Sequence, residues 1–401
     1  MRPRTPGGVW YSSEPSLGRG VNDILGSPAA TREKTEMNAD EDQEPIEGLD
    51  LTSRPEQGSH YPLDDVMVRN ETRTVGEVVK RIDQGRYAMN PDFQRDFVWP
   101  KDKQSKLIES CVMRIPLPVF YVAEGADGRV TVVDGLQRLS TFRSFLNGEL
   151  RLQGLGKKHP LEGKSFKALP INLRERIEDT QLTMYILDKN APDAARLDIF
   201  ERVNSGIPLT RQQMRNALYS GPATRWLADF SGKEVFRNAT GDSLQPKTMR
   251  DREAINRFCA FYLLDWTTYT AGDMDEYLAG ALKLMNRRSF DFQQLEKHLL
   301  LSLNRNSTLF GRHAFRKSLI YGASDVGRSV INIALFDVLS VAFAKIDNNI
   351  FTRDSLPIKN AIINLMRDSE FNHYITYSTN ATYQVHGRFR KMNEALGKFF
   401  K

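Results

Sequence analysis

The sequence predicts an α+β protein: a small α/β domain followed by a mostly α-helical domain, with a disordered tail at the N-terminus. Three observations predict this arrangement. Apolar runs of strand character fall within residues 118–188, and apolar residues recur at helical spacing almost throughout from Pro192 onward. Residues 1–60 are rich in Gly, Pro, Ser and acidic residues and have no sustained apolar period. We therefore expect a tail at 1–60, an α/β domain at 61–190 and a helical domain at 191–401.

Charge and composition limit the location and partners of the chain. Its 401 residues carry a formal net charge of +6, although residues 1–60 hold 6 Lys and Arg against 11 Asp and Glu. The remainder is strongly basic, which suits a polyanionic partner without distinguishing a nucleotide from a nucleic acid. No apolar run approaches the length of a membrane span, and no secretory pattern opens the sequence. With only two cysteines, Cys111 and Cys259, the chain fits a reducing cytoplasm, and we expect no membrane partner.

The first elements of the α/β domain are predicted from capping and breaking residues. Thr74 followed by Glu77 has the pattern of a capping box that opens a helix ending at Gly85. Prolines at both ends frame an extended segment at 91–100, and a further helix is expected from Asp102.

The middle of the α/β domain has the clearest strand patterns. Residues 118–124 and 129–135 are expected to be strands joined by a turn, and a helix follows from Leu136. The remaining expected elements are a short strand at 151–155, a helix at 170–178, a strand at 181–188, and helices at 193–204, 211–221, 251–266, 274–286 and 329–346.

The junction VVDGLQR, where the second of these strands meets the helix, is the first candidate site. Gly135 permits a tight strand-to-helix turn and close approach to the backbone. The first-turn amides of the helix are unpaired and positively polarised, so Arg138 beside them indicates a nearby anion, such as a phosphate. Asp134 at the strand end could coordinate Mg²⁺ or position a water molecule. The alternative is that Asp134 caps the helix and Arg138 pairs with a carboxylate elsewhere.

The segment FERVNSG, residues 200–206, is the second candidate. Its Arg202 and Asn204 could contact a ligand. Each also has an ordinary interpretation, because Asp198 lies four residues before Arg202 and Asn204 could simply end the helix.

The segment FQRDFVW, residues 93–99, is the third candidate. Gln94, Arg95 and Trp99 could present an amide, a cation and a stacking ring to a base or phosphate. Alternatively, its aromatic residues alternate with period two and form a half-buried strand.

Several other chemistries have no signature in this sequence. The six histidines have no Cys or His neighbours at zinc spacing, and no Walker loop or GxSxG motif occurs. The stretches FGRHAFRK at 310–317 and HGRFRK at 386–391 combine basic and aromatic residues, which is compatible with nucleic-acid contact. Solvated helix faces or ends explain both stretches more simply.

Taken in order and spacing, FQRDFVWP, VVDGLQRLSTF and FERVNSGIPLTRQQMRNAL resemble a known family, the N-terminal domain of GmrSD-type modification-dependent restriction systems. The resemblance covers roughly residues 65–220. It implies a ParB/sulfiredoxin-like core that binds and hydrolyses nucleoside triphosphates in defence against phage and other foreign DNA, usually beside an HNH-type nuclease domain.

The resemblance also implies roles for individual residues. Asp134, Gly135, Gln137 and Arg138 match the family motif D-G-Q-Q-R, which implies catalytic work for Asp134, Gln137 and Arg138. Nucleotide or phosphate contacts are implied for the remaining matched residues, which are Gln94, Arg95, Gly135, Arg202 and Asn204.

Two departures from the family pattern bear on activity. Leu136 replaces the first glutamine of the motif, which removes an amide that could orient water or phosphate and would favour a nucleotide sensor over a fast hydrolase. No histidine-containing nuclease signature follows residue 220, so any DNA cleavage is expected to come from a separate nuclease.

The sequence therefore predicts a cytoplasmic NTP hydrolase of a restriction or anti-phage system that uses Mg²⁺ with its nucleotide, with DNA and a separate nuclease as further partners. One alternative is a ParB-like DNA-binding adaptor without turnover, and another is a metal-dependent DNA nickase. The oligomeric state stays open, a homo-oligomer included.

Overall fold

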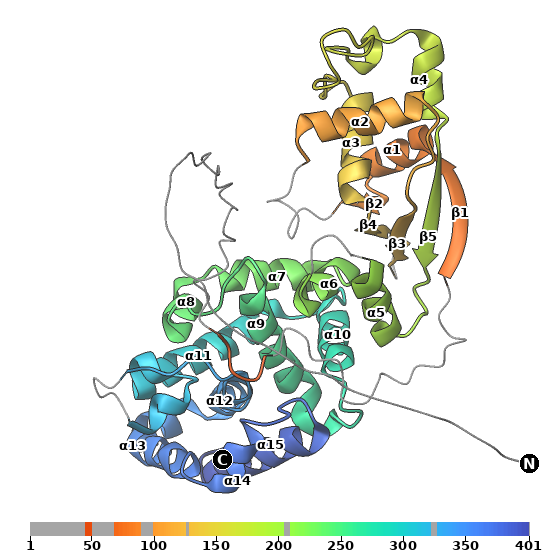
Figure 1. Cartoon of the computed structure of the whole chain (residues 1–401). Helices are drawn as coiled ribbons and strands as arrows, with labels where there is room; N and C mark the ends of the chain where they lie inside the picture. The colour runs from red at the N-terminus through yellow and green to blue at the C-terminus, as the bar shows by residue number, and fades with distance from the viewer. Residues whose placement is uncertain are drawn as a thin grey trace, which may run out of the picture. The chain divides into compact units, whose positions relative to one another are not determined.

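The computed structural model places a small mixed sheet before a long succession of helices (Figure 1), which confirms the predicted order of an α/β region and a helical region. All residues that it describes belong to one unit, Glu44–Lys401. It describes residues 45–49, 68–89, 99–125, 128–203, 209–321 and 327–400. The predicted boundary between residues 190 and 191 stays a prediction.

Five strands form the sheet in the order β1-β5-β3-β4-β2. The outer pair β1–β5 and the inner pair β3–β4 are antiparallel, whereas β5–β3 and β4–β2 are parallel. Their bounds are Val68–Thr74 for β1, Tyr87–Ala88 for β2, Phe120–Glu124 for β3, Val130–Asp134 for β4 and Gln181–Leu187 for β5. β3, β4 and β5 lie where the sequence predicts strands. No strand forms at 151–155, and β1 and β2 were not expected.

Four helices share a hydrophobic core with one face of the sheet. These helices are α1 (Val75–Asp83), α2 (Lys101–Val112), α3 (Leu136–Leu146) and α4 (Ile171–Glu178). Val122, Val132 and Met184 contribute the sheet side of this core. The Thr74 side chain accepts a hydrogen bond from the Glu77 amide over 3.2 Å, so the predicted cap of α1 is confirmed.

The other face of the sheet packs against the helices that follow it. Ala123, Val133 and Leu187 belong to the same core as residues of α5 (Asp193–Val203) and α6 (Arg211–Leu218). This alternation of neighbouring residues between two cores follows from the two-residue period of a strand.

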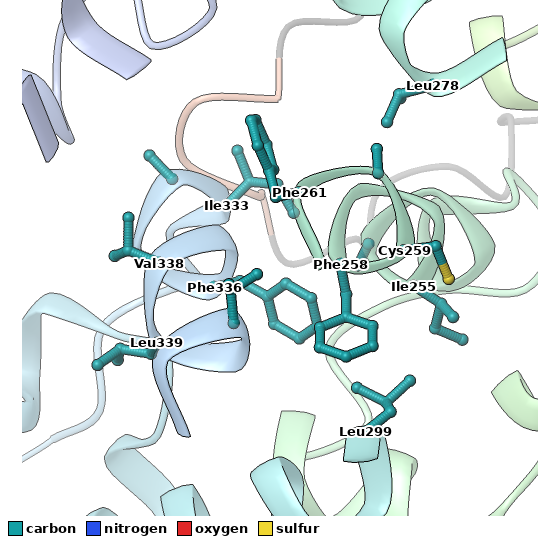
Figure 2. Close-up of a cluster of buried hydrophobic side chains, with 14 of the residues drawn as sticks. Ile255, Phe258, Cys259, Phe261, Leu278, Leu299, Ile333, Phe336, Val338 and Leu339 are labelled. Atoms are coloured by element: carbon teal, nitrogen blue, oxygen red, sulfur yellow. The ribbon is translucent and has the colours of Figure 1, made fainter. Parts of the chain in front are cut away.

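The remaining helices belong to this same second core, which is the larger of the two. Part of it is shown in Figure 2, where Phe336 of α12 points toward Phe258 of α9, near Leu299 of α11. The bounds are Pro222–Ser231 for α7, Glu234–Thr240 for α8, Arg250–Ala260 for α9, Met274–Met285 for α10, Phe292–Phe310 for α11, Ile333–Lys345 for α12, Asn348–Leu365 for α13, Ser369–Tyr374 for α14 and Thr382–Leu396 for α15. Among the described helices, none combines the length and apolarity needed to cross a membrane.

A short piece of the predicted tail is structured. Ile46 is buried in the helical core, and the Glu47 backbone pairs with residues 331–333 through two hydrogen bonds of 2.8 and 3.0 Å. Lys317 pairs with the Glu47 carboxylate. The acidic composition of this part of the sequence predicts no structure. Residues 45–49 are nevertheless held against the helical core by the buried Ile46 and the paired Glu47.

Candidate functional site

The corner between β4 and α3 is built on one glycine. Gly135 has a φ of 97° and a ψ of 9°, in the left-handed region that favours glycine. A Cβ atom there would fall on the Phe120 ring, 2.9 Å from Cε1 and closer still to Cδ1. Both the backbone conformation and this close approach therefore require glycine. The N-cap residue Gly135 has no side chain to cap α3, so the N-cap position leaves the first-turn amides their capacity to donate.

Arg138 is buried at this corner and forms hydrogen bonds to three residues around it. Its Nη2 atom donates to Asp134 Oδ2 over 2.7 Å and to the Val119 carbonyl over 3.1 Å, while Nη1 donates to the Pro118 carbonyl. The guanidinium also stacks on the Phe120 ring, with Cζ 4.2 Å from the ring centroid. Arg138 thus fastens the end of β4 to the loop that precedes β3.

The environment of Arg138 fits a positioning role. The residue is only 8% exposed, and burial lowers the pKa of its guanidinium while Asp134 opposes that shift. Arg138 has a carboxylate partner, as in the alternative interpretation of the motif, but that partner is Asp134 of the same motif. Contact between Arg138 and a phosphate stays a prediction.

Asp134 is the more accessible member of the pair, with 37% of its side chain exposed. It lies at an irregularity in the sheet, because Tyr121 pairs with Asp134 whereas Val122 pairs with Val132, so the ladder skips Val133. Irregularities of this kind bend a strand and redirect its side chains. The carboxylate is therefore held on one oxygen by Arg138 at the open end of β4.

Gln137 connects this corner to the upstream motif. Its Oε1 atom accepts a hydrogen bond of 3.1 Å from the Trp99 amide. The Trp99 carbonyl in turn accepts one from Gln104, and Lys103 lies over the indole ring. The end of the segment FQRDFVW is therefore fixed beside the motif. Its predicted ligand residues, Gln94 and Arg95, lie outside the described residues.

The third motif reaches the same strand through α5. Phe200 is fully buried and belongs to the same core as Val133 of β4, against which α5 packs. Arg202 lies in the last turn of α5 and is exposed. Asn204 lies outside the described residues. The helix that carries Arg202 therefore packs against the strand that carries Asp134, although the two are distant in the sequence.

The ordinary interpretation of Arg202 invoked Asp198, but Asp198 lies 3.4 Å from Nη1 of Arg211. Arg211 opens α6, which has a capping box between Thr210 and Gln213. The pairing of Asp198 with Arg211 depends on how α5 and α6 pack, so the sequence of α5 alone does not indicate it.

Leu136 departs from the family motif on the buried side of α3. Its side chain is 8% exposed and lies in the core that the sheet shares with the first four helices. A glutamine at this position would meet the same apolar surroundings. The substitution therefore removes no polar group from the side of the corner where Asp134 is exposed.

The residues that fix this corner and that the sequence did not indicate are Phe120 and the carbonyls of Pro118 and Val119. A backbone acceptor has no side-chain signal. The only indication in the sequence was Gly135, because a glycine allows another group, here the Phe120 ring, to lie close to the backbone.

Mg²⁺ is the metal ion that the predicted chemistry implies, and Asp134 is its expected ligand. Within the described part of the chain, no three His, Cys, Asp or Glu side chains are grouped to hold a metal ion. Mg²⁺ bound with a nucleotide commonly takes only one or two carboxylates, the phosphates and water. The half-accessible Asp134 carboxylate fits that limited requirement.

The two basic and aromatic stretches contribute to the helical core. Arg316 and Arg388 are fully buried, and Arg388 together with Arg257 pairs with the buried Asp337 at 2.9 and 2.6 Å. Lys317 pairs with Glu47. These residues are therefore committed to internal contacts. The simpler interpretation as solvated helix faces or ends is wrong for Arg316 and Arg388, because both lie in the core.

Two cavities among the described residues are lined by no motif residue. One of about 480 Å³ lies between α7 and α11 beside Trp226 and Phe292, and the other of about 600 Å³ lies beside Arg114 and Asn172. The candidate site is therefore described by the contacts around Asp134, Gln137 and Arg138.

Comparison with known proteins supports the interpretation of these motifs. Residues 75–220 match the family model described as GmrSD restriction endonuclease, N-terminal domain. No curated protein and no solved structure matches the chain. The matched range contains all three motifs and the elements that bring them together, from α1 to α6. The segment 75–220 of this chain therefore belongs to the GmrSD N-terminal domain family of restriction systems.

Proposed function

We propose that this protein binds a nucleoside triphosphate with Mg²⁺ at the corner between β4 and α3 and hydrolyses it within a restriction or anti-phage defence system. The observation that supports the proposal is that parts of two other motifs contact the junction of β4 and α3. Asp134 ends β4, Gln137 holds Trp99, and the α5 helix packs on β4 with Arg202 in its last turn. A ligand at this corner would meet side chains from all three.

Each residue has a proposed role that follows from its environment. Asp134 orients the attacking water and contributes a ligand to Mg²⁺. Arg138 is a positioning residue that fixes the Asp134 carboxylate, because both of its Nη atoms already donate to protein acceptors. The uncapped first turn of α3 donates amide hydrogen bonds to phosphate oxygens. Arg202, Arg95 and the amides then neutralise charge that develops on the phosphates.

Asp134 would hold the Mg²⁺ ion, which would supply positive charge to the phosphate group. The buried position of Leu136 supports turnover, because the missing glutamine would not have faced the accessible side of Asp134. Phosphoryl transfer depends mainly on positioning and electrostatics, so a site without a Ser or Cys nucleophile is suited to it.

Any DNA cleavage is proposed to come from a separate nuclease. Within the described residues the four histidines after residue 220 are engaged in structural contacts. His313 is buried against Ser318, and His386 bonds to the Tyr269 carbonyl. His298 likewise bonds to the Tyr262 hydroxyl over 2.6 Å. None of these histidines belongs to a cluster that could hold a metal ion in the described part of the chain.

A thermal-shift panel of nucleoside triphosphates and duplex DNA, with and without Mg²⁺, tests the proposal. A ligand that binds only the folded state raises the unfolding midpoint. We expect a Mg²⁺-dependent rise with at least one nucleotide. A rise with duplex DNA alone would support the adaptor in place of the hydrolase. The burial of Arg316 and Arg388 gives that adaptor no support from the two basic stretches.

A further inference from the structure

Residues 45–49 pair with the residues that lead into α12 as a short added strand. The Glu47 amide donates to the Ile331 carbonyl over 2.8 Å, and the Ile333 amide donates to the Glu47 carbonyl over 3.0 Å. In Figure 2 the segment is the faint red ribbon that passes beside Ile333. Proteins capture extended peptides by main-chain pairing of this kind at an open strand edge. The segment is therefore bound in the manner of a peptide ligand, although it belongs to the same chain.

Residues 331–333 also pair within the helical region. The Asn332 amide does not bond to Glu47 and donates instead to the Phe315 carbonyl over 3.0 Å. Removing residues 45–49 would leave the Ile331 carbonyl and the Ile333 amide without the partners that the segment supplies. An edge of this kind is a template for another extended chain.

Side chains on both sides of Glu47 add specificity to the main-chain pairing. Ile46 is 7% exposed and lies in the helical core, and Leu49 is partly buried against the same core. Between them, the Glu47 carboxylate forms an ion pair with Lys317. The surface that receives this segment therefore recognises an apolar residue, an acid and a second apolar residue at fixed positions.

Gly48 is required at the remaining position. Its φ of 79° lies in the left-handed region that favours glycine. An added Cβ atom would lie 3.2 Å from Oγ1 of Thr379 and 3.3 Å from Cγ2 of Ile333, and Oγ1 of Thr379 donates to the Gly48 carbonyl over 3.2 Å. Conformation and space both favour glycine, which completes a four-residue pattern, Ile-Glu-Gly-Leu.

We propose that residues 331–333, Lys317 and Thr379 form a docking surface for an extended peptide of the pattern apolar-Glu-Gly-apolar. Residues 46–49 occupy this surface as an internal ligand, and a partner chain that carries the same pattern displaces them. Displacement is feasible because the segment has one fully buried anchor, and regions with few buried apolar contacts open at low free-energy cost. The partner competes with a tethered copy whose effective concentration is on the order of 1 mM. The docking surface is independent of the proposed nucleotide site.

Peptide binding to the full-length protein tests the docking surface. In the released variant, which combines Ile46→Ser and Glu47→Ser, the internal ligand loses its apolar anchor and its charge, so the surface becomes accessible. The probe is a capped synthetic peptide with the sequence of residues 45–49, and the control peptide carries Gly48→Val. Binding is followed by NMR at the Ile333 amide, and urea unfolding establishes that each variant is folded.

We expect the released variant to bind the probe at least about tenfold more tightly than wild type, because the internal ligand of the wild type competes. The control peptide should bind more weakly than the probe by a similar factor. Adding Lys317→Glu to the released variant should weaken probe binding by about tenfold, and a peptide with Glu47→Lys should restore it. Equal affinity of the released variant and wild type, or of the two peptides, would overturn the proposal.

Hydrogen exchange in the wild-type protein tests displacement without any variant. We expect the amides of Glu47 and Ile333 to exchange at least about tenfold faster than the Asn332 amide, whose acceptor is the Phe315 carbonyl. Equal protection of the three amides would show that residues 45–49 open only with the core, and a partner could then not displace them.

Discussion

Nη2 of Arg138 lies 2.7 Å from Oδ2 of Asp134, although the two residues are separated by a left-handed glycine and belong to different elements. The same guanidinium does not face the surface, because it also donates hydrogen bonds to two backbone carbonyls of the loop before β3. Arg138 therefore determines where the Asp134 carboxylate lies relative to the sheet.

Replacing Arg138 by lysine tests this positioning role. A single ammonium cannot reproduce the planar set of donors that reaches Asp134, Pro118 and Val119 together. We expect a loss of about 1–3 kcal/mol in the free energy of unfolding, measured with urea. Arg143→Lys is the control, because Arg143 pairs with Asp83 at an exposed site, where the effect should stay within about 0.5 kcal/mol. Equal stability of the two variants would contradict the role.

Substitution of Gly135 by alanine should destabilise the corner. The left-handed conformation costs about 1–2 kcal/mol for a residue with a Cβ atom, and the clash with the Phe120 ring adds about 1–3 kcal/mol. Gly85→Ala separates the two effects, because Gly85 has a φ of 69° but nothing within 4 Å of the added atom. Denaturant unfolding should show the larger loss for Gly135→Ala, and a loss no greater than that of Gly85→Ala would rule out the close approach.

These two positions also show what the sequence could and could not predict. The strand, the glycine turn and the helix around residue 135 could be predicted from the sequence, because each has its own local pattern. The backbone acceptors of Arg138 could not be predicted, because the carbonyls of a proline-rich loop have no side-chain pattern in the sequence. β1 was missed for a similar reason: VRNETRT is a polar edge strand without apolar alternation. Arg388 looked like a surface cation, because its partner Asp337 lies in a distant helix.

The hydrogen bond between Gln137 and Trp99 predicts a local change in dynamics. In Gln137→Leu the Trp99 amide loses its acceptor, so its hydrogen exchange, measured by NMR, should accelerate by tenfold or more, as for loss of about 1.4 kcal/mol of protection. Gln104→Ala is the matched control, because Gln104 binds the Trp99 carbonyl and leaves its amide acceptor intact. Similar exchange in wild type and Gln137→Leu would mean that this bond does not hold the segment.

Asp251 predicts a dependence of stability on pH. It is 2% exposed, and burial raises the pKa of its carboxyl above the ordinary value. The folded state then retains a proton that the unfolded state releases, so Asp251 makes the protein less stable as pH rises through the raised pKa. Asp251→Asn should therefore be more stable than wild type near neutral pH and lose this advantage at about pH 4.

Asp242 provides a control of opposite sign. Its side chain is 65% exposed, and pairing with Arg237 lowers the pKa of its carboxyl. The interaction of Asp242 stabilises the folded state above the ordinary pKa and is lost on acidification, so Asp242→Asn should be neutral or slightly destabilising at neutral pH. Urea unfolding at several pH values checks both variants. A stability difference between Asp251→Asn and wild type that does not vary with pH would contradict the assignment.

The most direct test of the proposed site compares nucleotide hydrolysis by Asp134→Asn and Asp83→Asn. Both carboxylates pair with an arginine, at 2.7 and 2.8 Å, and 37% and 39% of their side chains are exposed. Arg138 is buried whereas Arg143 is exposed, so urea unfolding of both variants accompanies the assay and establishes that each is folded. With Mg²⁺ and saturating nucleoside triphosphate, phosphate release by Asp134→Asn should fall by about a hundredfold or more while Asp83→Asn matches wild type. Wild-type phosphate release by a folded Asp134→Asn variant would show that the corner between β4 and α3 is not where hydrolysis takes place.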